Sequence, residues 1–335
     1  MIVYIVRRLI LLVPVLLGVT FVTFALTRII PGNPVDRMIS PMASREVREQ
    51  VAEQAGLNDP LWQQYVHYVQ NVLTGDLGDS FVTSQPVVAD LTLRFPATFE
   101  LTAYAMLLAV TVAVPLGIVA AVRRDSWIDH LSRVVAVIGV AMPVFWVGLL
   151  ALYVFFYQLH WLPPPQGRIS PQSQPPQSVT SLYTVDALLT GNWSALRGSI
   201  EALVMPAGVL AFAAMAPLAR MARSGMIEAL NADYARAGRA LGLPERSIIF
   251  RHALRNAVLP LLTMTAFVYG YMLGGVVLVE NIFAWPGLGR YVFTAITSSD
   301  YPAVQGFILY ATTIYVLLFL LVDVLYMVLD PRIRY

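Results

Sequence analysis

Six long runs of apolar residues, each free of charged side chains, constrain this chain more than any other feature of its sequence. They span residues 9–27, 101–122, 134–159, 202–219, 257–279 and 302–322. Each is long enough for a helix to cross a bilayer core of ~30 Å, at roughly 1.5 Å per residue. Hydrophobic residues make up 58% of the chain, more than a water-soluble fold could bury. The runs predict an all-α membrane protein with six transmembrane helices, forming one domain over residues 1–335.

The apolar runs differ in length and in how clearly their ends are defined. The third is the longest, and we expect it to tilt or to protrude from the bilayer. The fourth is the shortest and contains Pro206 and Pro217, so its ends are the least defined. The first follows Arg7 and Arg8, as in a signal peptide, but it is longer than a signal's apolar segment and lacks an obvious cleavage site. We interpret it as a retained helix, with a cleaved signal as the alternative.

The distribution of arginine predicts the orientation. The chain has 22 basic residues, all arginine. Fourteen lie in segments 1–8, 123–133, 220–256 and 331–335, which total 61 residues, and eight lie in segments 28–100, 160–201 and 280–301, which total 137 residues. Segments rich in arginine stay in the cytoplasm. Both termini are therefore predicted to be cytoplasmic, with an extracytoplasmic loop over residues 28–100.

The outer loops show two kinds of sequence. Residues 45–57 and 58–73 read as two short helices, which form either a solvated cap or a docking surface for an extracytoplasmic partner. Residues 163–177 are rich in proline, serine and glutamine, so we predict an extended and mobile loop. Glu100, Glu280 and Asp323 lie near the ends of predicted spans, and we interpret them as interfacial, partly solvated carboxylates.

The segment from Ala235 to Pro260 carries five arginines between nearly uncharged regions. Gly242 can end one helix, and Pro244 can begin a second one. The second helix carries Ile248, Ile249 and Phe250 among arginines, a combination that suits docking against a protein. Contact with anionic lipid headgroups is the alternative. Lipid contact explains the charge but neither the Gly–Pro hinge nor the expected exposed apolar cluster.

Several chemistries have no support in the sequence. The chain has no Walker-type phosphate loop, so we do not expect it to bind ATP itself. It has no cysteines, and its four histidines lack metal-binding spacing. A net charge of +2 gives no reason to expect nucleic acid as a partner. The spans lack the ionisable groups of a self-powered carrier and the polar cluster of an intramembrane enzyme.

The arginine-rich segment resembles the "EAA" loop of ABC importer permeases, in the long form of the dipeptide/oligopeptide/nickel branch. The similarity rests on Ala237, Gly242 and the stretch RHALRNAVLP at residues 251–260. Arg236 and Gly238 depart from the general pattern in a way typical of the peptide branch. Four other segments resemble the family in the same order along the chain, and they are residues 7–34, 64–81, 274–306 and 323–335.

The resemblance implies a type I ABC importer permease fold in a bacterial inner membrane. It implies a transport subunit without a catalytic site, which moves di- or oligopeptides into the cytoplasm by alternating access. Implied partners are a second, homologous permease, one or two cytoplasmic ATPase subunits that hold ATP and magnesium, and an extracytoplasmic substrate-binding protein. Nickel chelates or glutathione are alternative substrates. From a different class, a stand-alone secondary carrier or channel would explain six spans but not the loop.

The same resemblance assigns site residues to two regions. The loop over residues 220–256 would couple the chain to the ATPase, with the coupling helix running from Pro244 to Phe250. The coupling residues are Arg236, Ala237, Gly238, Gly242, Pro244, Glu245, Arg246, Ile248, Ile249, Phe250, Arg251, His252, Arg255 and Pro260. Residues for binding-protein docking or an outer gate are Gln64, Tyr65, Trp285, Pro286 and Gly287. No metal site is expected.

Overall fold

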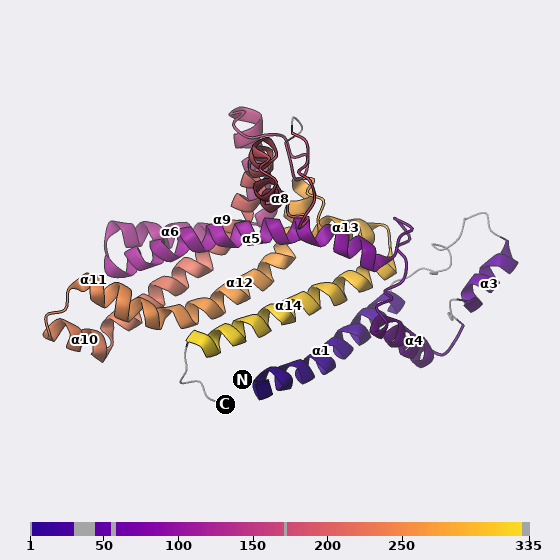
Figure 1. Cartoon of the computed structure of the whole chain (residues 1–335), viewed down its shortest axis with the longest axis horizontal. Coiled ribbons are helices and arrows are strands. Elements are labelled where there is room, and N and C mark those ends of the chain that lie inside the picture. Colours follow the sequence, from indigo (N-terminus) through magenta and orange to yellow (C-terminus); the bar gives the residue numbers. More distant parts are fainter. Residues whose placement is uncertain (1, 30–43, 55–57, 171–172, 330–335) are drawn as a thin grey trace. The chain divides into compact units, whose positions relative to one another are not determined.

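The computed structural model describes residues 2–29, 44–54, 58–170 and 173–329 (Figure 1). Within these ranges the secondary structure is helical, apart from one isolated bridge between Asp79 and Pro86. The elements are α1 (Ile2–Ile29), α3 (Arg45–Gln54), α4 (Leu61–Leu73), α5 (Val87–Val122), α6 (Trp127–Ala141), α7 (Val144–Ala151), η1 (Leu152–Gln158), α8 (Tyr183–Leu189), α9 (Trp193–Asn231), α10 (Asp233–Ala240), α11 (Glu245–Ser247), η2 (Ile248–Ala253), α12 (Leu254–Ile282), α13 (Leu288–Thr297) and α14 (Tyr301–Leu329). The labels η1 and η2 mark π-helical segments.

Four helices in the described residues are long and apolar enough to cross a membrane. They are Val87–Val122, Trp193–Asn231, Glu245–Ile282 and Tyr301–Val324. A fifth is obtained if α6 and the continuous α7–η1 helix count as one bent span, and α1 contributes a shorter apolar stretch at Ile10–Ala25. The prediction of an all-α protein with several apolar spans is confirmed. The two short helices predicted in the first outer loop are also present, as α3 and α4.

The third predicted span is not one straight helix. It breaks at Met142 and Pro143, where α6 and the following helix meet at 102°. Pro143 has no amide hydrogen to continue the helical pattern, and a residue before proline is driven out of the helical region. Met142 accordingly has an extended backbone, with a ψ of 124°. The expectation of a single tilted or protruding helix is therefore wrong at this position.

Helices α5 and α9 extend by more than ten residues beyond the apolar runs that predicted them. Helix α5 begins at Val87 rather than at residue 101, and α9 covers residues 193–231 rather than 202–219. Charged residues set the predicted ends, but side-chain pairs allow the helices to continue, as Asp90 does with Arg94 four residues later. Residues 220–231, the first part of the predicted coupling segment, therefore continue the helix of the fourth span.

The chain divides into two compact units. Of the described residues, those within 2–95 and 291–320 form the first unit, and those within 96–290 and 321–329 form the second. In the first unit, α4 packs on α1 through aromatic side chains. The ring of Tyr65 lies 5.5 Å from the ring of Phe24, and its hydroxyl is 3.1 Å from the hydroxyl of Thr20. Asp300, before α14, accepts a 2.5 Å hydrogen bond from Ser80.

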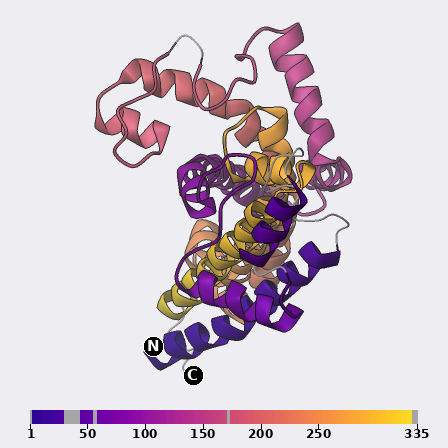
Figure 2. The ribbon, with the colours of Figure 1, turned by 90° about the vertical axis from the view of Figure 1, so that its right-hand side faces the viewer.

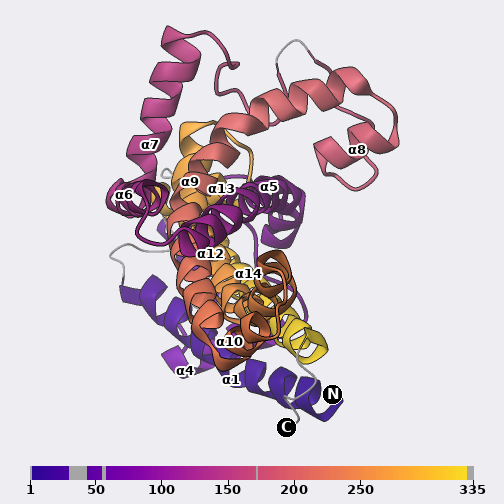
Figure 3. The same ribbon diagram turned by 90° about the vertical axis from the view of Figure 1, so that its left-hand side faces the viewer.

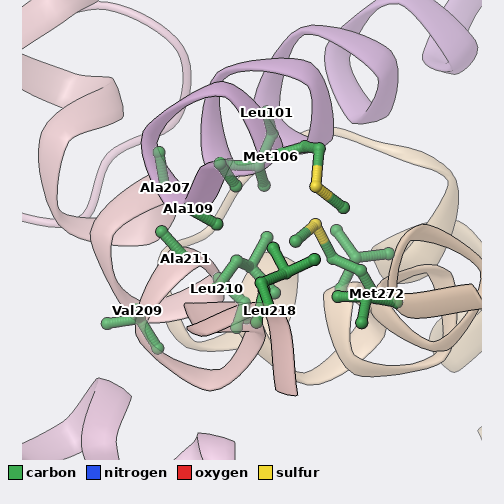
Figure 4. Packing of buried hydrophobic residues seen from close by; sticks show 14 of the residues in the cluster. Leu101, Met106, Ala109, Ala207, Val209, Leu210, Ala211, Leu218 and Met272 are labelled. Atoms are coloured by element: carbon green, nitrogen blue, oxygen red, sulfur yellow. The ribbon is translucent and has the colours of Figure 1, made fainter. Parts of the chain in front are cut away.

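The second unit is built on α5, α9 and α12. Their buried faces are rich in alanine, and Figure 4 shows Leu101 and Met106 of α5 near Leu210 of α9 and Met272 of α12. Small residues let helix backbones approach closely. At Gly117 of α5, an added Cβ would lie 2.6 Å from the carbonyl oxygen of Ala219 in α9. Within this unit, α7–η1 and α8 diverge on either side of α9 (Figures 2 and 3).

Candidate functional site

Helices α10 and α11, with the turn between them, form a helical hairpin that joins the end of α9 to η2 and α12, and the predicted coupling residues lie in this hairpin or in the first turns that follow it (Figure 1). Helix α10 ends at Ala240, and Gly242 follows with a φ of +76°, a conformation that glycine adopts without strain. The Gly242 amide donates to the carbonyl of Arg239, and the Leu243 amide donates to that of Gly238, both at 3.0 Å. Pro244 then caps α11. The predicted helix–hinge–helix arrangement is confirmed.

The hairpin is fastened to α9 through one arginine. Nε of Arg239 donates to Oε1 of Glu245 at 2.7 Å, and its Nη1 donates to the Leu230 carbonyl at 3.1 Å. One guanidinium thus links α10, α11 and the last turn of α9. A second pair, Arg236 with Asp233, lies within α10 and is exposed.

The apolar residues of the hairpin divide into an inner and an outer set. Ile248 is completely buried beside Gly238, and Ile249 is half-buried against Met226 and Ala253. Phe250 is 61% exposed. Together with the exposed Leu241 and Leu243, it forms what we call the hairpin patch. The predicted exposed cluster of Ile248, Ile249 and Phe250 is therefore wrong for Ile248, because that side chain packs inside the hairpin against α10 beside Gly238.

The predicted short coupling helix is not separate from the fifth span. Residues 245–282 form one continuous helix, which passes through the π-helical segment η2 and into α12. A π-helical turn inside an α-helix is often found at functional sites. The remaining coupling residues are exposed on this helix or on the hairpin, and they are Arg236, Ala237, Gly242, Pro244, Glu245, Arg246, Arg251, His252, Arg255 and Pro260.

The turn after α12 lies at the other end of that helix, and there the predicted outer-gate residues are mostly packed inside. Trp285 is buried, and its indole nitrogen donates a 2.9 Å hydrogen bond to the carbonyl of Ala97. Gly287 is also buried, in a place with no room for a Cβ because Thr98 and Glu280 occupy it. Pro286 is exposed. Trp285 therefore anchors the turn to α5.

The other two predicted docking residues, on α4, are half-buried. Gln64 donates from its side-chain amide to the carbonyl of Asp59 at 2.7 Å. Tyr65 packs on α1, with its hydroxyl 3.2 Å from the carbonyl of Leu17. Both side chains thus contribute to the packing of the first unit.

Two of the three acidic residues near span ends are buried rather than partly solvated. Glu280 is fully buried and accepts hydrogen bonds from the Thr98 hydroxyl at 2.6 Å and from the Arg290 amide at 2.9 Å. Glu100 is also buried, and it pairs with Arg168 at 2.7 Å. Asp323 is half-buried, as predicted. The sequence could not show the hydrogen bonds that make burial of the first two carboxylates tolerable.

The pairing of Glu100 also fixes the proline-rich loop. The Arg168 guanidinium lies over the ring of Tyr183, at 3.9 Å from its centroid. Nearby in α8, burial opposes the ionisation of Asp186. Hydrogen bonds from the side chain of Thr180 and from backbone amides of residues 179–181 outweigh this effect and lower the pKa of Asp186 below its usual value. The expectation of a mobile loop is therefore wrong for Arg168.

A second ion pair lies inside the bundle and was not predicted. Asp129 at the start of α6 is completely buried. Arg223 of α9 donates hydrogen bonds to its two carboxylate oxygens from Nε and Nη2. The two hydrogen bonds measure 2.5 and 2.8 Å. The only signal of this pair in the sequence is that Asp129 and Arg223 each lie next to an apolar run.

A cavity of about 560 Å³ lies where α6 breaks, between α9 and α12. Its walls are mostly apolar and include Pro143, Pro217, Phe267 and Tyr271. Arg220 is the one charged residue among those that line it. Ligand sites in proteins have this size and this apolar character with a few polar groups. Among the described residues, no group of three histidine or acidic side chains could hold a metal ion.

These features define an integral membrane protein with a helical hairpin fastened to two of its long apolar helices. Comparison with known families identifies the chain further. It belongs to the binding-protein-dependent transport system inner membrane component family, whose pattern matches residues 113–335. The pattern for the N-terminal membrane component of such systems matches residues 1–102. The resemblance found in the sequence is confirmed, and the chain is a membrane permease subunit of an ABC transporter, not an enzyme.

Individual relatives match over nearly their full length. The chain is 44% identical over 335 residues to the dipeptide transport system permease protein of Alkalihalophilus pseudofirmus, covering all of both chains. It is 43% identical to the probable D,D-dipeptide transport system permease protein of Escherichia coli K12, covering 96% of this chain and 94% of the relative. It is 36% identical to the glutathione transport system permease protein of Escherichia coli O6:H1, covering 99% of each chain.

Proposed function

We propose that this chain forms one half of the membrane pathway of an ATP-driven peptide importer and moves di- or oligopeptides into the cytoplasm by alternating access. The observation that carries the proposal is the unbroken helix from Glu245 to Ile282, which joins the hairpin to a membrane span. A force applied to the hairpin would reach that span directly. The names of the relatives, which include permeases for dipeptides and for glutathione, support a short peptide as substrate.

The proposed arrangement has six spans in a bacterial inner membrane, with both termini in the cytoplasm. Helix α1 is the first span, and the bent α6–η1 pair is the third. The arginine-rich hairpin then faces the cytoplasm, and residues 28–100 lie outside. An alkaline phosphatase reporter fused after Tyr335 should be inactive, and a fluorescent protein at that position should be active. Active phosphatase there would contradict the orientation.

The hairpin patch is the proposed contact with a cytoplasmic ATPase subunit, which holds ATP and magnesium. Phe250, Leu241 and Leu243 are exposed, and Arg239, Arg246 and Arg251 lie close to them in the sequence. A second, homologous permease completes the pathway, and a substrate-binding protein delivers the peptide from outside. Of the residues predicted for docking or an outer gate, Pro286 is exposed, whereas Trp285 and Gly287 would hold the shape of the turn that carries it. Nickel chelates and glutathione are the alternative substrates.

A pair of substitutions tests the coupling role. Phe250→Asp should abolish ATP-dependent uptake and release the ATPase during purification, because it places a charge in an apolar contact. Membrane insertion and thermal stability should not change, because Phe250 is exposed. Ile248→Asp should instead unfold the hairpin, because it buries an unpaired charge. Leu73→Asp, on another exposed side chain, is the matched control. Normal uptake by the Phe250 variant would contradict the coupling role.

Reconstitution tests the function as a whole. The chain should purify with a second permease and one or two ATPase chains. Liposomes that contain this complex should take up peptide only when binding protein and ATP are present. Uptake by this chain alone, without ATP, would favour a secondary carrier or channel instead.

A further inference from the structure

The cavity beside the break in α6 combines apolar walls with charged and polar groups at fixed places, and this combination points to a specific ligand. Arg220 lines the cavity and forms no hydrogen bond or ion pair with any other residue in the described ranges. By contrast, the next arginine on the same helix, Arg223, is held by Asp129. An arginine within a membrane-type helix that has no partner of its own is available to bind an anion.

The break supplies groups of the opposite character. Gly139, Val140 and Ala141, in the last turn of α6, line the cavity. Pro143 has no amide hydrogen for the Gly139 carbonyl. The other two carbonyls accept no hydrogen bond from any residue that the structure describes. Free carbonyls at the C-terminal end of a helix carry partial negative charge and favour a cation.

We propose that this cavity binds the two charged ends of a peptide. The guanidinium of Arg220 binds the C-terminal carboxylate, and the free carbonyl groups of Gly139, Val140 and Ala141 bind the N-terminal ammonium. The inference rests on the proposed function, since it requires that the chain transports peptides, and it adds the groups by which the pathway recognises them.

The remaining walls explain why such a site would accept many peptides. Phe267 and Tyr271 of α12 line the cavity and are exposed, and the small residues Ala213 and Gly275 belong to the same lining. Apolar walls of this kind contact side chains without selecting one of them by hydrogen bonding. Recognition of the two ends alone therefore fixes the peptide's orientation and leaves its side chains free to vary.

Cysteine protection tests the site without measuring transport. The chain contains no cysteine, so Ala213→Cys creates a single thiol in the cavity. In the assembled transporter, with and without ATP, dialanine should slow alkylation of this thiol. Dialanine amide and N-acetyl-dialanine, which each lack one charge, should protect about 10- to 150-fold less well, since each loses a charge-assisted hydrogen bond. Adding Arg220→Gln should remove protection by dialanine, whereas Arg197→Gln, an exposed arginine on the same helix, should not.

The outcomes separate the site from the function. Equal protection by dialanine and its amide would overturn the proposal, and this comparison needs no change at Arg220. A Leu73→Cys variant carries its thiol far from the cavity in the sequence. Equal protection of that thiol by dialanine would show that the protection is nonspecific and would overturn the proposal. Labelling that responds to anionic lipid but not to peptide would assign Arg220 to a lipid phosphate and also overturn it. ATP-dependent uptake of dialanine without any protection would refute the site alone, and absence of uptake would refute the proposed function.

Discussion

Thr98 in α5 and Glu280 in α12 are joined by a 2.6 Å hydrogen bond, although 182 residues separate them in the sequence. The Thr98 hydroxyl donates to the carboxylate, and its oxygen accepts a 2.8 Å hydrogen bond from the amide of Leu288. One small side chain therefore fastens α5 to α12 and to the start of α13. All three groups are buried, so water cannot replace any of them.

Replacing Thr98 by valine should destabilise the protein by about 1–3 kcal/mol, because the Glu280 carboxylate and the Leu288 amide each lose a partner. Valine preserves the shape of the side chain. Thr111→Val is the matched control, because that exposed hydroxyl bonds only carbonyls of its own helix. Thermal unfolding in detergent measures both variants. Equal unfolding midpoints for the two variants would contradict the role of Thr98.

The buried pair of Asp129 and Arg223 predicts strong coupling between two positions. Arg223→Met should cost about 1.5–3 kcal/mol, since the buried carboxylate loses two charge-assisted hydrogen bonds and keeps only the more distant Arg133, at 3.8 Å. The double variant Arg223→Met with Asp129→Asn should regain most of that stability. Arg124→Met is the control, because the pair of Arg124 with Asp125 is exposed and should contribute at most about 1 kcal/mol. A double-mutant cycle with no coupling energy would show that the pair does not matter.

The close approach of α5 to α9 predicts that glycine is required at position 117. Gly117→Ala places a methyl group 2.6 Å from the carbonyl oxygen of Ala219, so the helices must separate. We expect a loss of about 1–3 kcal/mol. Gly208→Ala has no atom within 4 Å of its new methyl group and should be neutral or stabilising. The yield of folded protein in detergent compares them, and a stable Gly117 variant would refute the close packing.

The hydrogen bonds to Asp186 predict how the outer loop responds to pH. Burial opposes ionisation, but the hydrogen bonds from Thr180 and its neighbours prevail and lower the native pKa of Asp186. Their stabilisation is therefore present above the ordinary aspartate pKa of about 3.9, and it is lost as the pH falls below that value toward the native pKa. Limited proteolysis of residues 173–192 should increase over this range.

Asp186→Asn is the control for the pH response. The amide cannot lose or gain a proton in this range. The rate of loop cleavage at neutral pH should therefore be higher than in the native chain, and it should change less as the pH falls. A variant with the same pH response as the native chain would assign the effect to another group.

The hairpin shows what local sequence determines. Gly242 and Pro244 set the turn between its two helices through the backbone conformations they allow, and these effects act within a few residues. The apolar runs likewise predicted most of the membrane-type helices, because hydrophobicity is a property of the local chain. The break at Pro143 also follows from a local backbone restriction, that of proline. It was not predicted because the apolar run continues through it without interruption.

Other features depended on residues far apart in the chain. Ile248 and Phe250 are both large apolar residues in the sequence, but only Ile248 packs against α10 beside Gly238 and is buried. Glu100 and Asp129 have no visible partner nearby in the sequence, but in the structure they form ion pairs with Arg168 and Arg223. The sequence by itself determined the class of protein, the helices and the turn of the hairpin. Only the tertiary structure decided which charges are paired and which arginine lines the cavity, because burial of a charge depends on the partner that packing brings to it.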